Sequence, residues 1–197
     1  QRFKRGEAIV TQGQQSNCLS ILLTGRARVM TTDERGREVI LATLGPGDYT
    51  GEMSLIDNQP HSASVRADLQ TDVLLLGRTE FARCLGENSA MAYAVMKGLV
   101  QRLRQADRNI ESLALMDVYG RVARVLIESA TDDSPGRKVI NGKLSRQDVA
   151  KMIGASREMV SRVIKDLEEQ GFIEVRADGV TFINDRRNPG RALTRPV

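Results

Sequence analysis

The sequence of 197 residues contains one histidine, two cysteines and no tryptophan. It therefore has few of the side chains that metal sites and catalytic centres commonly use. Cys18 and Cys84 stand alone, without C-x-x-C spacing, so we interpret them as reduced structural thiols and predict no metal site. One histidine and no nucleophile–base constellation argue against an enzyme. No apolar run approaches the roughly 20 residues that span a bilayer, and the chain does not open on an apolar signal segment. These absences favour a cytoplasmic protein without a membrane partner.

The charge is distributed unevenly along the chain. Residues 1–117 carry 14 Lys/Arg and 14 Asp/Glu, whereas residues 118–197 carry 15 and 11. The whole net charge of +4 therefore lies in the second part. A basic excess confined to one region points to a polyanionic partner, although a chance excess on a solvated surface explains four charges equally well.

The first part of the chain, up to about Gly86, is predicted to consist of short strands. Recurrent glycines and polar turns separate its apolar segments, as in an all-β barrel or sandwich. A hairpin turn is predicted at Asp33–Gly36. The strand segments are Ile21–Leu23, Ala27–Met30, Glu38–Leu41 and Val73–Leu76.

A long helix is predicted from about Ser89 to Met116, where apolar residues repeat as a heptad seam. The narrow, strict repeat favours a parallel dimer helix, and hence a homodimer, over an amphipathic helix lying on its own domain. The seam consists of Ala92, Met96, Leu99, Leu103, Ala106, Ile110 and Leu113. A second helix is predicted from Val118 to about Ala130, with Asp117 as its N-cap.

The segment Leu144–Gln170 is predicted to be a helix-turn-helix. Ser145 is the expected N-cap of its first helix, Gly154 supplies the positive φ of the turn, and Ser156 caps the second helix. A β-hairpin wing is expected to follow at Phe172–Ile183. The predicted buried face of the two helices consists of Val149, Ala150, Met152, Ile153, Met159, Val160, Val163, Ile164 and Leu167.

The second helix leaves a polar outer face, as a recognition helix in the major groove requires. Arginine pairs bidentately with guanine, and glutamate accepts from the amino group of cytosine. The alternative is a solvated helix pair without a DNA partner. The residues predicted to contact double-stranded DNA are Ser145, Arg146, Ser156, Arg157, Glu158, Ser161, Arg162 and Lys165.

The stretches Leu144–Ala150, Gly154–Arg162 and Gly47–Glu52 resemble the catabolite activator (CRP/FNR) family of bacterial transcription regulators, and the resemblance extends over essentially the whole chain. It implies an α+β fold with a cyclic-nucleotide-binding β-roll at 1–86, a dimerisation helix at 87–116 and a winged helix-turn-helix at 117–197.

The resemblance also implies partners and a DNA site. Arg157, Glu158 and Arg162 fall where the family's base-reading residues sit, and the implied DNA half-sites resemble TGTGA. RNA polymerase is the implied protein partner, with the family's promoter-contact loop matched only by the short segment Thr131–Arg137.

The ligand cassette departs from the cAMP-binding relatives. These have Gly-Glu, a short helix, and Arg-Ser or Arg-Thr followed by Ala, whereas here His61 replaces the phosphate-pairing arginine. The residues that match are Gly51, Glu52, Ser62 and Ala63. Ala106 and Asp107 take the places of two adenine-contacting hydroxyl residues, which argues against tight cAMP binding.

No permanent cofactor is predicted, and a cyclic nucleotide is the expected effector. Arg104 and Asp107 suit guanine and phosphate groups, so the pattern favours cyclic di-GMP slightly over cAMP, with no nucleotide effector as a third possibility. A nucleotide-binding regulatory subunit that controls a protein partner is the alternative function. The predicted ligand residues are Gly51, Glu52, Met53, His61, Ser62, Ala63, Arg104 and Asp107.

Overall fold

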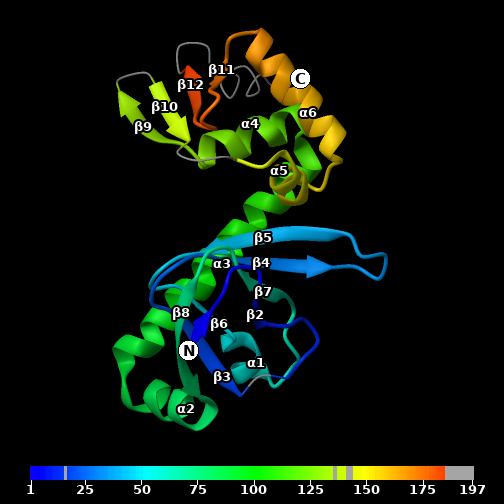
Figure 1. Cartoon of the computed structure of the whole chain (residues 1–197). Coiled ribbons are helices and arrows are strands. Elements are labelled where there is room, and N and C mark those ends of the chain that lie inside the picture. The colour runs from blue at the N-terminus through cyan, green and yellow to red at the C-terminus, as the bar shows by residue number, and fades with distance from the viewer. Residues whose placement is uncertain (16, 135–136, 141–143, 185–197) are drawn as a thin grey trace. The chain divides into compact units, whose positions relative to one another are not determined.

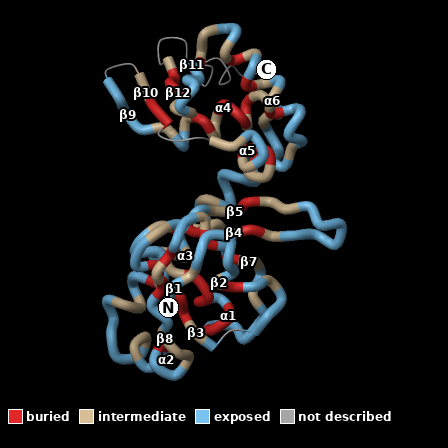
Figure 2. The backbone as a smooth tube through the Cα atoms, in the orientation of Figure 1, coloured by how far each residue is buried: buried red, intermediate tan, exposed pale blue. Residues whose placement is uncertain are grey.

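The computed structural model describes residues 1–15, 17–134, 137–140 and 144–184. The chain divides into two compact units, which meet in sequence between Arg104 and Gln105. Each unit has its own hydrophobic core, and Figure 2 shows buried residues gathered inside both. Within the described ranges, no helix is both long and apolar enough to cross a membrane.

The first unit is built on two four-stranded antiparallel sheets, with strand orders β1-β8-β3-β6 and β2-β7-β4-β5 (Figure 1). Their bounds are β1 (Arg2–Phe3), β2 (Ala8–Val10), β3 (Cys18–Leu22), β4 (Ala27–Thr32), β5 (Glu38–Leu44), β6 (Tyr49–Thr50), β7 (Ser64–Ala67) and β8 (Thr71–Gly77). Three of the predicted strand segments lie within β4, β5 and β8 and are confirmed, whereas Ile21–Leu23 overlaps β3 but extends past its end at Leu22. The predicted turn joins β4 to β5, where the Gly36 N–H donates to the Asp33 carbonyl at 2.9 Å.

Helices interrupt the strands of the first unit. The short helix α1 (Glu52–Asp57) follows β6, and α2 (Arg78–Glu87) follows β8. The expectation of strands up to Gly86 is therefore wrong for residues 78–86. The reason is that Phe81 and Leu85 lie one helical turn apart and both pack into the same core cluster, with Phe81 only 2% exposed.

The long helix is confirmed as α3 (Ser89–Leu115). One side of its N-terminal part packs on the first unit's core through buried Val95 and half-buried Leu99. Four seam residues, by contrast, are exposed in the single chain: Met96 (56%), Leu103 (63%), Ile110 (64%) and Leu113 (58%). The helix thus covers its own domain with one face and leaves most of the heptad seam uncovered.

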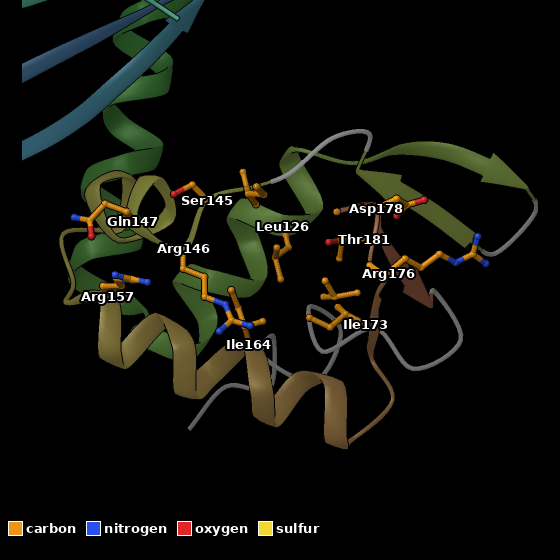
Figure 3. Close-up of a pocket in the computed structure, with 14 residues that line it drawn as sticks. Leu126, Ser145, Arg146, Gln147, Arg157, Ile164, Ile173, Arg176, Asp178 and Thr181 are labelled. Atoms are coloured by element: carbon orange, nitrogen blue, oxygen red, sulfur yellow. The ribbon is translucent and has the colours of Figure 1, made fainter. Parts of the chain in front are cut away.

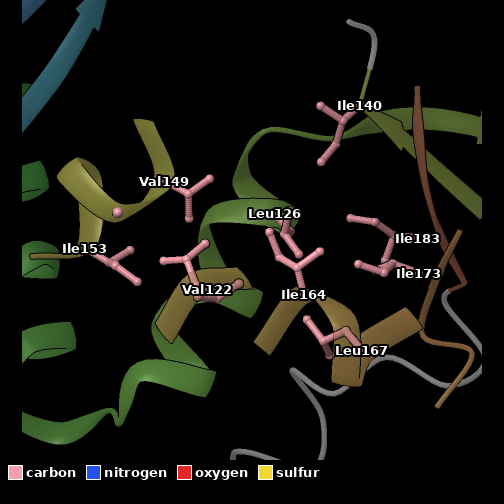
Figure 4. Close-up of a cluster of buried hydrophobic side chains, with 11 residues drawn as sticks. Val122, Leu126, Ile140, Val149, Ile153, Ile164, Leu167, Ile173 and Ile183 are labelled. Atoms are coloured by element: carbon pink, nitrogen blue, oxygen red, sulfur yellow. The ribbon is translucent and has the colours of Figure 1, made fainter. Parts of the chain in front are cut away.

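The second unit contains three more helices, α4 (Val118–Glu128), α5 (Arg146–Ile153) and α6 (Arg157–Glu169). The Asp117 carboxylate accepts a hydrogen bond from the Gly120 N–H at 2.8 Å, which confirms it as the N-cap of α4. Buried residues of all three helices and of the sheet form one core (Figure 4). Those at most 2% exposed are Val122, Val149, Val160, Leu167 and Ile183.

The sheet of this unit has the strand order β11-β12-β10-β9. The hairpin β11 (Ile173–Val175) and β12 (Thr181–Asn184) confirms the predicted wing. Strands β9 (Thr131–Ser134) and β10 (Arg137–Ile140) lie in a segment for which no strand was predicted. They form because β10 pairs both with β9 and with β12, whose residues lie 41 to 47 positions further along the chain than their partners in β10. The segment matched to the promoter-contact loop coincides with β9, and residues 135–136 lie outside the described residues.

Two glycines of the first unit have left-handed backbones and offer a matched test of how closely its chain segments pack. Gly25 has a φ of +85° and Gly36 a φ of +75°, but a Cβ at Gly25 would lie 2.4 Å from the Gln70 carbonyl oxygen, whereas one at Gly36 meets nothing within 4 Å. We expect Gly36→Ala to lower the free energy of unfolding by about 1–2 kcal/mol, the cost of the left-handed conformation. Gly25→Ala should cost about 1–3 kcal/mol more, because backbone must move. Urea denaturation measures both, and equal losses would contradict the close approach.

Candidate functional site

The helix-turn-helix in the second unit is fixed by local interactions. Gly154 ends α5 with a φ of +64°, and the Ser156 hydroxyl accepts a hydrogen bond from the Met159 N–H at 3.2 Å. Ser145 occupies the N-cap position of α5, but its hydroxyl makes no capping hydrogen bond. The Arg121 guanidinium on α4 donates to the Ile153 carbonyl at 2.8 Å and so satisfies an acceptor at the C-terminal end of α5. The turn and both adjoining helix ends are therefore held in place.

The outer face of α6 carries the predicted reading residues. Arg157, Glu158, Arg162 and Lys165 are exposed, whereas Ser161 is half-buried rather than exposed as expected. Met159 was predicted to be buried but is 44% exposed. The packed side of α6 is centred on Val160, Ile164 and Leu167, which lie three to four residues apart, and Met159 falls beside that stripe.

Glu158 is held as an anion at the start of α6. Its own backbone N–H and the Ser156 hydroxyl are the main causes that lower the pKa of its carboxyl group, with smaller contributions from Arg157 and Arg162. A carboxylate in this position is an acceptor only. The start of α6 therefore presents one acceptor beside the Arg157 donor, with Arg162 one turn further on, and such donors and acceptors can pair with guanine and cytosine edges.

A pocket of about 690 Å³ lies between the starts of α5 and α6 and the wing (Figure 3). Arg146 and Arg157 both line it, on the side of the two helices. Residues 175–179 of the wing line the opposite side, and Leu126, Ile164 and Ile173 contribute apolar surface. Helix α6 and the wing thus border one concave surface, and no local pattern in the sequence connects the wing turn with Arg146 and Arg157.

The wing is stiffened by a stacked charge cluster. The guanidinium carbons of Arg137 and Arg176 lie 3.8 and 4.4 Å from the centroid of the Phe182 ring. Glu174 pairs with both arginines, at 3.3 Å for Arg137 and 3.2 Å for Arg176. Arginine stacked on an aromatic ring loses less freedom when it binds an anion. Arg176, at the wing turn, is a preorganised cation that the sequence analysis missed.

The candidate effector site in the first unit begins with a glycine that no other residue can replace without strain. Gly51 has a φ of +96°, and a Cβ there would lie 2.8 Å from the Cys18 carbonyl oxygen. This conformation directs the chain from β6 into α1, so that the next residue, Glu52, turns into the protein and is 1% exposed.

Glu52 is a buried carboxylate with only one oxygen paired. Its Oε1 forms an ion pair with Arg102 of α3, and Oε2 has no hydrogen-bond partner. Burial raises the pKa of the Glu52 carboxyl group, and the attraction of Arg102 offsets this only in part. An unsatisfied buried acceptor is costly. The site is therefore suited to a ligand that supplies a hydroxyl donor, such as a ribose.

Arg102 joins this carboxylate to the long helix. Besides Glu52, it donates to the Tyr49 carbonyl oxygen, and its guanidinium carbon lies 4.8 Å from the centroid of the Tyr49 ring. The Tyr49 hydroxyl in turn donates to the Val95 carbonyl at 2.9 Å. In the sequence, Arg102 was only a polar residue off the heptad seam, and no local signal connects it with a carboxylate 50 residues away.

The structure brings three of the predicted ligand residues together. Gly51, Glu52 and half-buried His61 gather at the start of α1, and the buried hydroxyl of Ser54, which was not predicted, lies 3.1 Å from His61 Nδ1. Ala63 is half-buried in the backbone that follows. The remaining predicted side chains are exposed: Met53, Ser62, Arg104 and Asp107.

Both units match protein-family models. Residues 1–88 match the family described as cyclic nucleotide-binding domain, and residues 120–188 match the Crp-like helix-turn-helix domain. In solved structures, the chain is similar in fold to the c-di-GMP responsive global regulator CLP of Xanthomonas campestris. That similarity has a TM-score of 0.80 at 24% identity, over 93% of this chain and 92% of that one.

Curated relatives are similar over nearly the full length. The cAMP-activated global transcriptional regulator Vfr of Pseudomonas aeruginosa is 31% identical, over 94% of this chain and 89% of the relative. The cAMP-activated global transcriptional regulator CRP of Salmonella typhimurium is 30% identical, over 92% and 87%.

The contact between Tyr49 and α3 yields a test by paired glycine substitutions. A Cβ at Gly98 would lie 2.1 Å from the Tyr49 hydroxyl oxygen, whereas one at Gly86 in α2 meets nothing within 4 Å. Alanine is favoured over glycine in a helix by up to about 1 kcal/mol, so Gly86→Ala should be neutral or stabilising. We expect Gly98→Ala to destabilise by about 1–3 kcal/mol, because Tyr49 must move. Chemical denaturation measures both, and stabilisation by Gly98→Ala would contradict the contact.

Proposed function

Since the chain belongs to the CRP/FNR family of transcription regulators, we propose that a cyclic nucleotide bound at Glu52 controls its binding to DNA through α6. The protein is a regulator and not an enzyme. The single observation that supports the effector site is the unpartnered Oε2 of Glu52, because a carboxylate 1% exposed needs a donor that the described side chains do not supply.

DNA recognition is supported by the exposed first turn of α6. Arg157 and Glu158 lie at the helix start and Arg162 lies one turn further on, so the three side chains share the face that enters a major groove. The adjacent concave surface brings the wing turn and Arg146 to the side of this helix, where the sugar-phosphate backbone of the DNA would run. Ser145, Ser156, Ser161 and Lys165 are proposed as further contacts around these.

Two effectors remain candidates. A cyclic mononucleotide such as cAMP is favoured by the compact group of Glu52, Arg102 and His61, which offers partners for one ribose and one phosphate. Cyclic di-GMP, which the sequence favoured, needs a larger set of contacts, and the exposed side chains of Arg104 and Asp107 are the residues suited to them. Calorimetric titration with each nucleotide separates the two.

The homodimer is supported by the uncovered seam of α3. Met96, Leu103, Ile110 and Leu113 are all more than half exposed in the single chain, which is costly for a row of large apolar side chains. A second copy with the same heptad repeat would cover them. Two α6 helices would then read a two-fold symmetric site, and RNA polymerase is the proposed further partner. A regulatory subunit acting on a protein alone would not need the exposed face of α6.

Substitutions in α6 distinguish base reading from phosphate contact. Arg157→Ala should weaken binding to a symmetric site with TGTGA half-sites by about 1–3 kcal/mol and relax specificity at one guanine of each half-site. Lys165, which pairs with Glu169 at 3.5 Å, serves as the comparison. Lys165→Ala should weaken all sequences alike and reduce the salt slope by about 1 per contact.

These outcomes are read from titrations of specific and scrambled DNA at two salt concentrations, with saturating effector. If Arg157→Ala loses the same affinity on both DNAs, α6 is not the reading helix.

The seam is tested by placing a charge within it. Leu103→Asp should convert the dimer into a monomer, because each seam would bury an unpaired carboxylate at a cost of several kcal/mol. Gln101→Asp places the same charge at an exposed position off the seam and should leave the dimer intact. Analytical ultracentrifugation reports the mass of each variant. An unchanged dimer in Leu103→Asp would exclude this seam as the interface.

A further inference from the structure

His61 is held near the start of α1 both by its backbone and by its ring. Its backbone N–H donates to the Gln14 carbonyl at 2.9 Å, and its carbonyl accepts from the Gly13 N–H at 2.8 Å. Its Nδ1 lies 3.1 Å from the Ser54 hydroxyl, and its Cε1 is 3.7 Å from the position that a Cβ of Gly51 would take. The edge of the His61 ring therefore lies beside Gly51, the residue that directly precedes Glu52 and α1.

Ser54 is the hydrogen-bond partner of one nitrogen of the His61 ring, Nδ1. Its side chain is 2% exposed, so its hydroxyl has little access to water and its partner is the His61 ring. When the imidazole is neutral with its hydrogen on Nε2, Nδ1 accepts a hydrogen bond from the Ser54 hydroxyl. When the ring is protonated, Nδ1–H donates to the same hydroxyl oxygen. The pair thus persists in both charge states, and Nε2–H is a donor in each.

The charged and titratable groups that contact α1 have partners other than the His61 ring. Arg78 of α2 donates to the Ser54 and Leu55 carbonyl oxygens at 3.2 and 3.1 Å. On α1, Glu52 pairs with Arg102 of α3, and the Asp57 carboxylate accepts from the Gln59 N–H. Cys18 of β3 borders Gly51 through its carbonyl oxygen. Burial is the cause that lowers the pKa of His61. The ring is therefore mainly neutral at pH 7 in the free protein.

We propose that His61 contacts the phosphate of the effector through Nε2–H and takes up a proton when the effector binds, with Ser54 as its positioning residue. This inference rests on the proposed function, since it assigns a role within the same effector site. The phosphodiester of a cyclic nucleotide remains an anion across the titration range of histidine, so the proton goes to the ring and not to the ligand.

The sign of the pH dependence follows from the two states of His61. In the free protein burial favours the neutral ring, and in the complex a phosphate anion favours the charged ring. The pKa is therefore higher in the complex, and binding takes up a proton between the two pKa values. Affinity should rise as the pH falls through this interval, by at most about tenfold per pH unit, and level off below the pKa of the free protein.

The chain has a single histidine, so the test can be read from one residue. Ring ¹⁵N chemical shifts, followed from about pH 5 to about pH 8, report the tautomer and the titration of His61 with and without cAMP. We expect the Nε2–H tautomer in the free protein and a raised pKa on addition of cAMP. Ser54→Ala should produce a mixture of tautomers and shift the midpoint of the titration, which a merely structural role would not do.

Calorimetry of cAMP binding provides the second readout. In wild-type protein the affinity should increase from about pH 8 to about pH 6, and two buffers of different ionisation enthalpy should reveal proton uptake. His61→Gln keeps an N–H donor without titrating, so it should bind with an affinity that does not vary with pH. His61→Arg should bind more tightly, also without pH dependence, because its charge is permanent. Thermal unfolding confirms that each variant is folded.

The possible results separate the two proposals. Binding of cAMP with no pH dependence in the wild type, or with the pKa of His61 unmoved, overturns the role of His61 and leaves the effector site standing. A dominant Nδ1–H tautomer in the free protein overturns the role of Ser54. If neither cAMP nor cyclic di-GMP binds at any pH, the proposed effector fails, and this inference fails with it.

Discussion

The first unit depends on a carboxylate that is buried although one of its oxygens has no hydrogen-bond partner. Glu52 is 1% exposed, and Arg102 neutralises one of its oxygens while the other has no partner. Removing a charge from water is costly, and an opposite charge repays that cost only when the remaining lone pairs are also satisfied. The fold therefore leaves one oxygen of Glu52 without a hydrogen bond, and a ligand with a hydroxyl donor would supply it. Because Arg102 also contacts Tyr49, the same pairing ties β6 and α1 to the long helix.

The long helix α3 packs on the core of the first unit and also carries the exposed seam residues. Val95 and the seam residue Leu99 pack against the core of the first unit, whereas other seam residues, such as Leu103 and Ile110, are more than half exposed. A helix with a single apolar stripe would lie on its own domain and present nothing to a partner. Here Arg102 of the same helix pairs with Glu52, so the candidate effector site contacts the element that carries the exposed seam residues. This arrangement is what a ligand-controlled dimer requires, since the ligand must favour one of two arrangements of that element.

In the second unit, polar side chains are exposed on a helix that is packed against a small hydrophobic core. The turn at Gly154 and the cap at Ser156 fix where α6 begins, and Arg121 satisfies the end of the preceding helix. The packed stripe of α6 lies on the core, so Arg157 and Glu158 project from a helix that has little freedom to move. Side chains carried on a packed helix lose less entropy when they bind a partner.

The sequence alone determined the features that depend on neighbours along the chain. Caps, the turn glycine and apolar spacing act within a few residues, so the helix-turn-helix, the long helix and the wing were predicted close to their observed bounds. Tertiary structure decided the rest. Arg102 meets Glu52, 50 residues away, only because the chain folds back on itself, and β10 forms only because β12 pairs with it. Such pairs leave no periodic signal in the sequence, because the free energy that selects them comes from burial and hydrogen bonding between distant segments.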